Sequence, residues 1–249
     1  MKKPFPLSEA LLLLGVLVLC VLAIPTKVPP VVQSSAYHLF ADARTFWEIP
    51  HTFDSLSNIG FLLFGAYGLC LARLQRLELF SASFKASVIT FFIGFVATAA
   101  GSTYYHLAPD NPGLVVDRLG MVIVFAGMLG MGAAQRVSER AGWAMLGFGL
   151  LAGPASVLYW AASGSLLPYA VMQAGGITLT CFMLLGAKRG PGPLWWVMVL
   201  SYGMAKVCES HDVQIFEITG HLLSGHTVKH LLAALPALAI TEALKRKPN

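Results

Sequence analysis

Charged side chains are scarce in this chain of 249 residues. Only 12% of the residues are Asp, Glu, Lys or Arg, whereas 56% are hydrophobic. A water-soluble domain carries about 25% charged residues to cover its surface, so most of this surface faces a solvent other than water. The composition excludes a soluble globular domain, and its high hydrophobic content excludes a disordered chain. It predicts a protein embedded in lipid.

Cysteine is also rare, with four residues in the whole chain. Secreted disulfide scaffolds are far richer in cysteine, and thiol metal sites use closely spaced Cys-x-x-Cys pairs, which are absent here. All four cysteines lie within apolar runs, so they are expected to be buried, inert thiols. They are Cys20, Cys70, Cys181 and Cys208.

Long apolar runs make up roughly two thirds of the chain, and a transmembrane helix needs roughly 20 such residues. The links between the runs are short and leave no room for an extramembrane domain, so one all-α helix bundle is predicted. The eight runs are Leu7–Ile24, Leu56–Leu74, Lys85–His106, Leu114–Gln135, Gly142–Ala162, Leu167–Ala187, Pro193–Cys208 and Ser224–Leu244.

Positive charges exceed negative ones by five, but they form short clusters between the apolar runs, which argues against nucleic acid as a partner. Lys and Arg near segment ends stay in the cytoplasm, and here they mark every second link. Both termini are therefore predicted to be cytoplasmic, while links 25–55, 107–113, 163–166 and 209–223 face outward. The cytoplasmic set is Lys2, Lys3, Arg73, Arg76, Lys85, Arg136, Arg140, Lys188, Arg189, Lys245, Arg246 and Lys247.

The first run, Leu7–Ile24, has two interpretations. Because it follows two lysines, it resembles a secretory signal segment. It is long for a signal core and lacks a clean small-x-small cleavage site, so an additional membrane helix is favoured. The orientation of the other seven runs is the same in either case.

Ionisable side chains gather at the predicted outer ends of three runs, where their cost in a membrane marks a candidate functional site. His226 and His230 are four residues apart, so they share one face of a helix. His106 ends the third run, with Ser102 one turn before it, and Asp117 begins the fourth. A bundle brings facing helices together at one depth, so these five side chains are candidates for one site.

Three histidines are a typical ligand set for a catalytic zinc ion, which keeps a fourth position open for water. Two alternatives stay open. A single histidine at a membrane interface is commonly a polar anchor, and this role is preferred for His38, His51 and His211. Histidines on two helices also bind haem, although an i,i+4 pair suits a small ion better.

The pattern Ser102-x3-His106-x10-Asp117, followed by His226-x3-His230, resembles the zinc-site signature of the alkaline ceramidase family. That family belongs to the seven-helix membrane hydrolases and the adiponectin-receptor-like proteins. Residues 52–58 are similar to the family's FWNTxSN stretch, and the resemblance covers most of the chain. It implies a seven-helix domain over residues 31–249, preceded by an extra hydrophobic segment over residues 1–30.

The resemblance implies a zinc-dependent amidase that hydrolyses the N-acyl amide of a ceramide-like lipid, which enters from the bilayer, to a fatty acid and a free amine base. His106, His226 and His230 would hold zinc, Asp117 would act as the base, and Ser102 would steady the oxyanion or the ligands. A receptor- or channel-like protein with structural zinc is the alternative, since fold does not fix chemistry.

Two departures from the family pattern refine this expectation. Eukaryotic members carry an acidic calcium-binding stretch, but the position of its Glu is His51 here, which argues against calcium. Short loops and the lack of an Asn-x-Ser/Thr acceptor favour a bacterial inner-membrane protein with its metal site near the outer face. The sequence does not define the oligomeric state.

Structural roles are expected for several other polar residues. Lys206 and Glu209 are three residues apart and are expected to form a local ion pair. Asp54 and Asn58 either cap the helix that begins near them or contact a substrate headgroup, and the capping role is preferred. Arg118 is expected to be an interface anchor.

Overall fold

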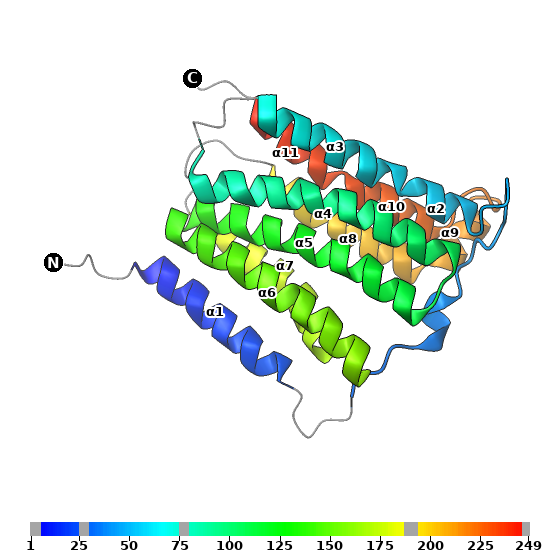
Figure 1. Ribbon diagram of the computed structural model, residues 1–249, viewed down its shortest axis with the longest axis horizontal. Coiled ribbons are helices and arrows are strands. Elements are labelled where there is room, and N and C mark those ends of the chain that lie inside the picture. Colours follow the sequence, from blue (N-terminus) through cyan, green and yellow to red (C-terminus); the bar gives the residue numbers. More distant parts are fainter. Residues whose placement is uncertain (1–5, 25–29, 75–79, 187–193, 246–249) are drawn as a thin grey trace. The chain divides into compact units, whose positions relative to one another are not determined.

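The computed structural model describes residues 6–24, 30–74, 80–186 and 194–245, and most of these residues are helical (Figure 1). No β-strand occurs in these four ranges, which contain only the isolated bridges Val32–Ser165 and Phe46–Ile49. The helices are α1 (Leu7–Ala23), α2 (Thr52–Ser57), α3 (Ile59–Leu74), α4 (Ala82–Leu107), α5 (Asn111–Arg136), α6 (Glu139–Ser163), α7 (Leu167–Leu184), α8 (Trp195–Ser210), α9 (Asp212–Ile218), α10 (Gly225–Ala234) and α11 (Pro236–Lys245), with the 3-10 turn η1 at Ser35–His38.

Six stretches of the described chain are long and apolar enough to cross a membrane. The structure therefore has the features of an all-α, multi-pass membrane protein, but it does not reproduce the predicted count of seven helices plus one. The first helix, α1, has 17 residues, and α8 has 16 and carries Lys206 and Glu209. The six are Thr52–Arg73, Ala82–Leu107, Asn111–Arg136, Glu139–Ser163, Leu167–Leu184 and Gly225–Lys245.

Several of the lysines and arginines that predict the orientation lie outside the described residues. The described ones are Arg73, Lys85, Arg136, Arg140 and Lys245. The orientation thus stays a prediction. Those outside are Lys2, Lys3, Arg76, Lys188, Arg189, Arg246 and Lys247.

The chain forms two compact units, of which the first comprises Met1–Gln33, Glu78–Phe91 and Val122–Gly190. In this unit α7 packs against α1 and α6. Leu12 of α1 is buried in an apolar cluster with Leu179 and Met183 of α7. Glu9 is buried and pairs with Arg140. The first apolar run is thus packed against the other helices of this unit.

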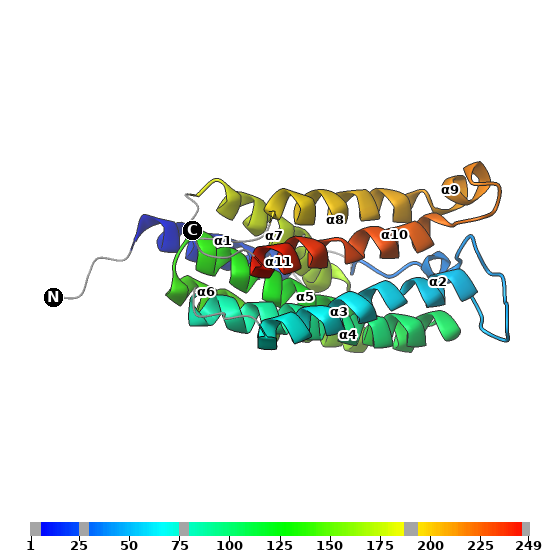
Figure 2. The ribbon, with the colours of Figure 1, turned by 90° about the horizontal axis from the view of Figure 1, so that it is seen from above.

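The second unit comprises Ser34–Leu77, Phe92–Met121 and Pro191–Asn249, and it holds every candidate site residue. Here α10 packs against α8, α2, α3 and α9, while α11 packs against α3 and α8 (Figure 2). The predicted run Ser224–Leu244 is divided into α10 and α11, because Pro236 has no N–H group to continue the helical hydrogen bonds. Its first part carries two of the three candidate ligand histidines.

Two glycines let α4 and α5 approach closely in the second unit. A Cβ atom on Gly101 would lie 2.7 Å from the carbonyl oxygen of Val116, and one on Gly120 would lie 2.6 Å from the backbone nitrogen of Thr98. Real Cβ atoms do not fit at such distances. This close approach brings the end of α4 against the start of α5, where Ser102 and Asp117 lie.

The four cysteines are free thiols, as predicted. Their burial was predicted less well, since Cys208 is buried but Cys20 and Cys70 are exposed. Both exposed thiols lie on apolar helices. An outward-facing position on such a helix meets lipid rather than water in a membrane, so apolar surroundings do not require burial within the protein.

Candidate metal centre

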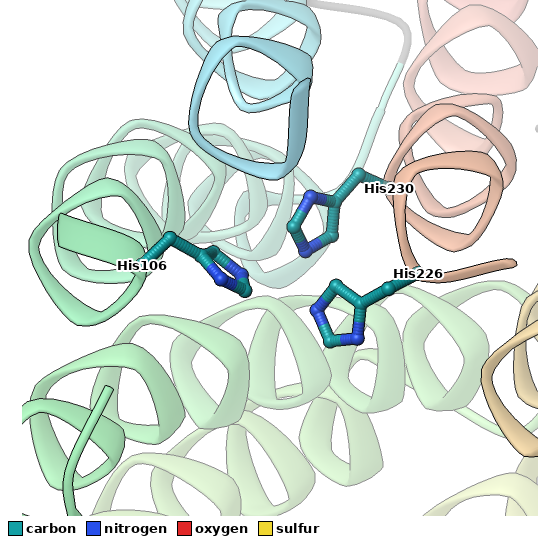
Figure 3. A group of neighbouring side chains, drawn as sticks. All are labelled: His106, His226 and His230. Atoms are coloured by element: carbon teal, nitrogen blue, oxygen red, sulfur yellow. The ribbon is translucent and has the colours of Figure 1, made fainter. Parts of the chain in front are cut away.

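Three histidines converge in the second unit (Figure 3). His106 comes from the last turn of α4, and His226 and His230 lie one turn apart in α10. All three are buried, and their candidate ligand atoms lie within 4.8 Å of one another. The ring centroids of His106 and His230 are 5.1 Å apart, and the other two pairs are 4.8 Å apart. The structure thus brings together the histidines selected from the sequence.

The ring of His106 indicates that this cluster suits a metal ion. His106 is fully buried, yet neither of its ring nitrogens has a hydrogen-bond partner among the described residues. Leaving a buried polar group unpaired costs about 1–3 kcal/mol, and an ion bound to one nitrogen would remove part of that cost. Nitrogens bound to tetrahedral zinc lie roughly 3.4 Å apart, so binding would draw the rings slightly together.

A small ion also fits the ring packing better than haem does. Haem bound by two histidines separates them with a flat macrocycle. Here each of the three rings contacts the other two at 4.8–5.1 Å. The arrangement therefore favours the metal-ion interpretation over the haem one.

Ser57 of α2 sets the orientation of His230. The Ser57 hydroxyl donates to the backbone carbonyl of Asp54 at 2.8 Å. It is therefore left to accept from Nδ1–H of His230, at 2.7 Å. The network thus assigns the proton of His230 to Nδ1 and the lone pair to Nε2. Such a contact fixes the tautomer and direction of a ligand histidine.

His226 has a charged neighbour, because the ammonium group of Lys229 lies 2.9 Å from its Nε2. Lys229 also donates to Glu209 Oε1 at 3.1 Å, and Glu209 pairs with Lys206 as the sequence predicted. A metal ion bound at Nε2 of His226 would replace the lysine hydrogen bond. Lys229 and the ion are therefore competing cations.

Removal of this ammonium group is expected to raise zinc affinity in the variant Lys229→Met. A lysine charge and a doubly charged ion about 6 Å apart repel by about 5.5 kcal/mol at an effective dielectric constant of 20. Because Glu209 offsets part of this repulsion, we expect an increase in affinity of roughly tenfold, or about 1.4 kcal/mol. A zinc titration against a competing chelator measures it. Lys206→Met is the control, since Lys206 pairs with the same Glu209.

Two carboxylates hold the N-terminus of α10. Asp54 Oδ1 accepts hydrogen bonds from Ser224 Oγ at 3.0 Å and Thr227 Oγ1 at 2.6 Å. Asp212 Oδ1 accepts from the backbone N–H of His226 at 2.7 Å. Negative groups near a helix N-terminus stabilise the helix. Both carboxylates therefore fix the helix that carries two candidate ligands.

Asp54 does not cap its own helix as predicted, whereas Asn58 is the C-cap residue of α2. The residue that precedes α2 is His51, which makes no side-chain capping bond. Asp54 instead reaches α10, and the Asn58 amide donates to the Asp54 carbonyl at 3.1 Å. Ser224 and Thr227 are about 170 positions away in sequence, so spacing gives no sign of this contact.

Ser102 and Asp117 are both buried, and their side chains are hydrogen-bonded to each other. The charged neighbours that act on the Asp117 carboxyl are Lys229, Arg118 and Glu209. Lys229 also contacts His226, so the same ammonium group acts on Asp117 and on one ring of the cluster.

Arg118 and His38 differ from the anchors expected at their positions. Arg118 is buried, and its guanidinium lies 5.6 Å from the ring centre of Tyr37. His38 Nδ1 pairs with Tyr105 Oη at 2.8 Å. Burial raises the pKa of Tyr37 well above its usual value, so its hydroxyl stays protonated and donates to Glu209 at 3.1 Å.

His51 and His211, the other two histidines for which an anchor role was predicted, lie outside the cluster. His51 Nδ1 contacts the carbonyl of Asp42 at 3.2 Å. His211 is exposed and its Nδ1 lies 3.0 Å from the carbonyl of Val207. Neither belongs to the three-histidine group. Both observations agree with the non-ligand roles expected for them.

The fold and this cluster define an all-α protein with membrane-spanning helices and a candidate three-histidine metal centre. No model of a known protein family matches the chain, and no curated protein matches it. The resemblance to alkaline ceramidases therefore rests on the residue pattern quoted above.

Proposed function

We propose that the chain is a zinc-dependent membrane amidase that hydrolyses the N-acyl amide of a ceramide-like lipid to a fatty acid and a free amine base. The supporting observation is the buried cluster of His106, His226 and His230, in which both ring nitrogens of His106 are unpaired among the described residues. A buried carboxyl group, Asp117, shares the charged neighbour Lys229 with His226. Three histidines and a carboxylate are a typical set for metal-assisted hydrolysis.

The proposed mechanism divides the work among these residues. A zinc ion held by the three histidines would supply Lewis acidity, which polarises the acyl carbonyl and activates water near neutral pH. Asp117 takes a proton from the attacking water as its oxygen bonds to the acyl carbon, and gives that proton to the amine nitrogen as the C–N bond breaks. Ser102 orients the Asp117 carboxyl through their hydrogen bond.

In the membrane, we propose that α8 crosses together with the six long stretches, which gives seven helices, and that α1 is the extra one. The termini lie in the cytoplasm and the histidines near the outer face, as the positions of Lys and Arg favour. The substrate enters from the bilayer. A bacterial inner membrane is the proposed location.

Metal removal tests the proposed reaction directly. Protein purified in detergent is expected to release fatty acid from a short-chain ceramide, to lose nearly all of this activity after treatment with a chelator, and to regain it when zinc is added. Fatty-acid release measures the activity, and addition of magnesium in place of zinc is the control. Hydrolysis that continues in fully metal-stripped protein would refute the proposal.

A further inference from the structure

The segment Ser34–Asp42, which we call the strap, runs over the three-histidine cluster. Phe40 packs its ring against His226, with centroids 4.5 Å apart, and against His106, at 4.8 Å. The ring also meets Tyr105 at 5.8 Å. Phe40 itself is half-buried. One apolar side chain therefore contacts two of the three candidate ligand rings.

Hydrogen bonds tie the strap to helices on both sides of Phe40. Before Phe40, the side chains of Tyr37 and His38 form these hydrogen bonds. After Phe40, the backbone N–H of Ala41 donates to Asp212 Oδ2. The other oxygen of Asp212 accepts from the backbone N–H of His226, so the strap and the ligand helix share one carboxylate. The bonds are Tyr37 to Glu209 at 3.1 Å, His38 to Tyr105 at 2.8 Å, His38 to Asn111 at 3.1 Å, and Ala41 to Asp212 at 2.8 Å.

We infer that Phe40 is a positioning residue that covers the candidate metal centre and slows the exchange of its ion. The apolar ring keeps water from two of the ligand histidines, and an apolar shell controls solvent access and coordination at a metal site. An ion that enters or leaves on this side requires the strap to detach. The inference rests on the proposed metal centre and does not depend on amidase activity.

Metal exchange measured without substrate tests this role. The full chain in detergent is loaded with Co²⁺, mixed with excess chelator, and followed by the visible absorption of the bound ion. Phe40→Ala is expected to lose cobalt at least tenfold faster than the wild type while still binding about one ion per chain. Phe40→Leu keeps an apolar side chain at this position, so its rate of cobalt loss is expected to be close to that of the wild type.

The matched control is Phe46→Ala. Phe46 is another phenylalanine close by in sequence, but its ring packs on Phe53 at 5.9 Å and on Trp47 at 6.4 Å. Its removal is expected to leave cobalt release unchanged. His38→Ala loosens the strap without altering Phe40, and is expected to speed release by a smaller factor than Phe40→Ala.

The absorption spectrum separates a covering role from general destabilisation. Water that reaches the ion in Phe40→Ala raises the coordination number, and six-coordinate cobalt absorbs more weakly than four-coordinate cobalt. Equal release rates and spectra in Phe40→Ala, Phe46→Ala and the wild type would overturn the inference. If the alanine variant does not fold, the same comparison is made with His38→Ala. A wild type that binds no metal would refute both the metal centre and the role of Phe40. A wild type that binds metal but shows no amidase activity would refute the amidase proposal alone.

Discussion

The double variant His226→Ala/His230→Ala is expected to contain no zinc, whereas the wild type purified in detergent contains about one ion per chain. Both residues belong to α10, and their removal leaves His106 as the one remaining histidine of the cluster. Structural zinc in zinc-finger peptides has an apparent binding free energy of about 10–16 kcal/mol, and the loss of two of three ligands removes most of the binding energy of such a site. Elemental analysis of the two proteins measures the loss.

The control for this experiment is His211→Ala. His211 lies in the same unit but is exposed and outside the cluster, so its removal is expected to leave the zinc content unchanged. Helical content and elution as a single species show whether each variant has folded. A well-folded wild type without zinc would mean that the three histidines do not form a metal centre.

Much of the fold could be predicted because apolar runs of membrane length have few alternatives to a helix. Each of the eight runs corresponds to helix in the described residues. The prediction is wrong about where helices are interrupted and where they begin. Ser224–Leu244 contains a break before Pro236, and the second run begins earlier, at Thr52, with an interruption at Asn58 between α2 and α3. Such interruptions depend on local hydrogen bonding rather than on hydropathy.

The ligand histidines could be predicted for a related reason. The i,i+4 spacing of His226 and His230 fixes their common face, and the depth of His106 at the end of its run places it near them. The supporting residues could not be predicted. Ser57 and Asp212 act on α10 through contacts between segments distant in sequence, and spacing within one helix contains no information about them.

The strap was missed because loops leave no periodic pattern. It begins with a 3-10 turn, and the loop that follows has left-handed backbone at Trp47, Glu48 and His51. Non-glycine residues rarely adopt this conformation, so their positions are set by the tertiary structure. The sequence therefore predicted His38 as an anchor without indicating that its neighbour Phe40 packs on the ligand rings.

Asp117→Asn is expected to lower the rate of ceramide-like amide hydrolysis by roughly 10²–10⁴-fold, the usual contribution of a general base, while the zinc content stays unchanged. The amide group has the size of the carboxylate and can accept the Ser102 hydrogen bond, but it cannot take a proton from water. Asp110→Asn is the control, since Asp110 Oδ1 accepts from Gly113 N–H at 2.6 Å and Asn caps a helix as well as Asp. Fatty-acid release and elemental analysis are measured together. Full activity in Asp117→Asn would assign the role of general base to another group. A wild type that contains zinc but hydrolyses no amide would favour a receptor- or channel-like protein with structural zinc.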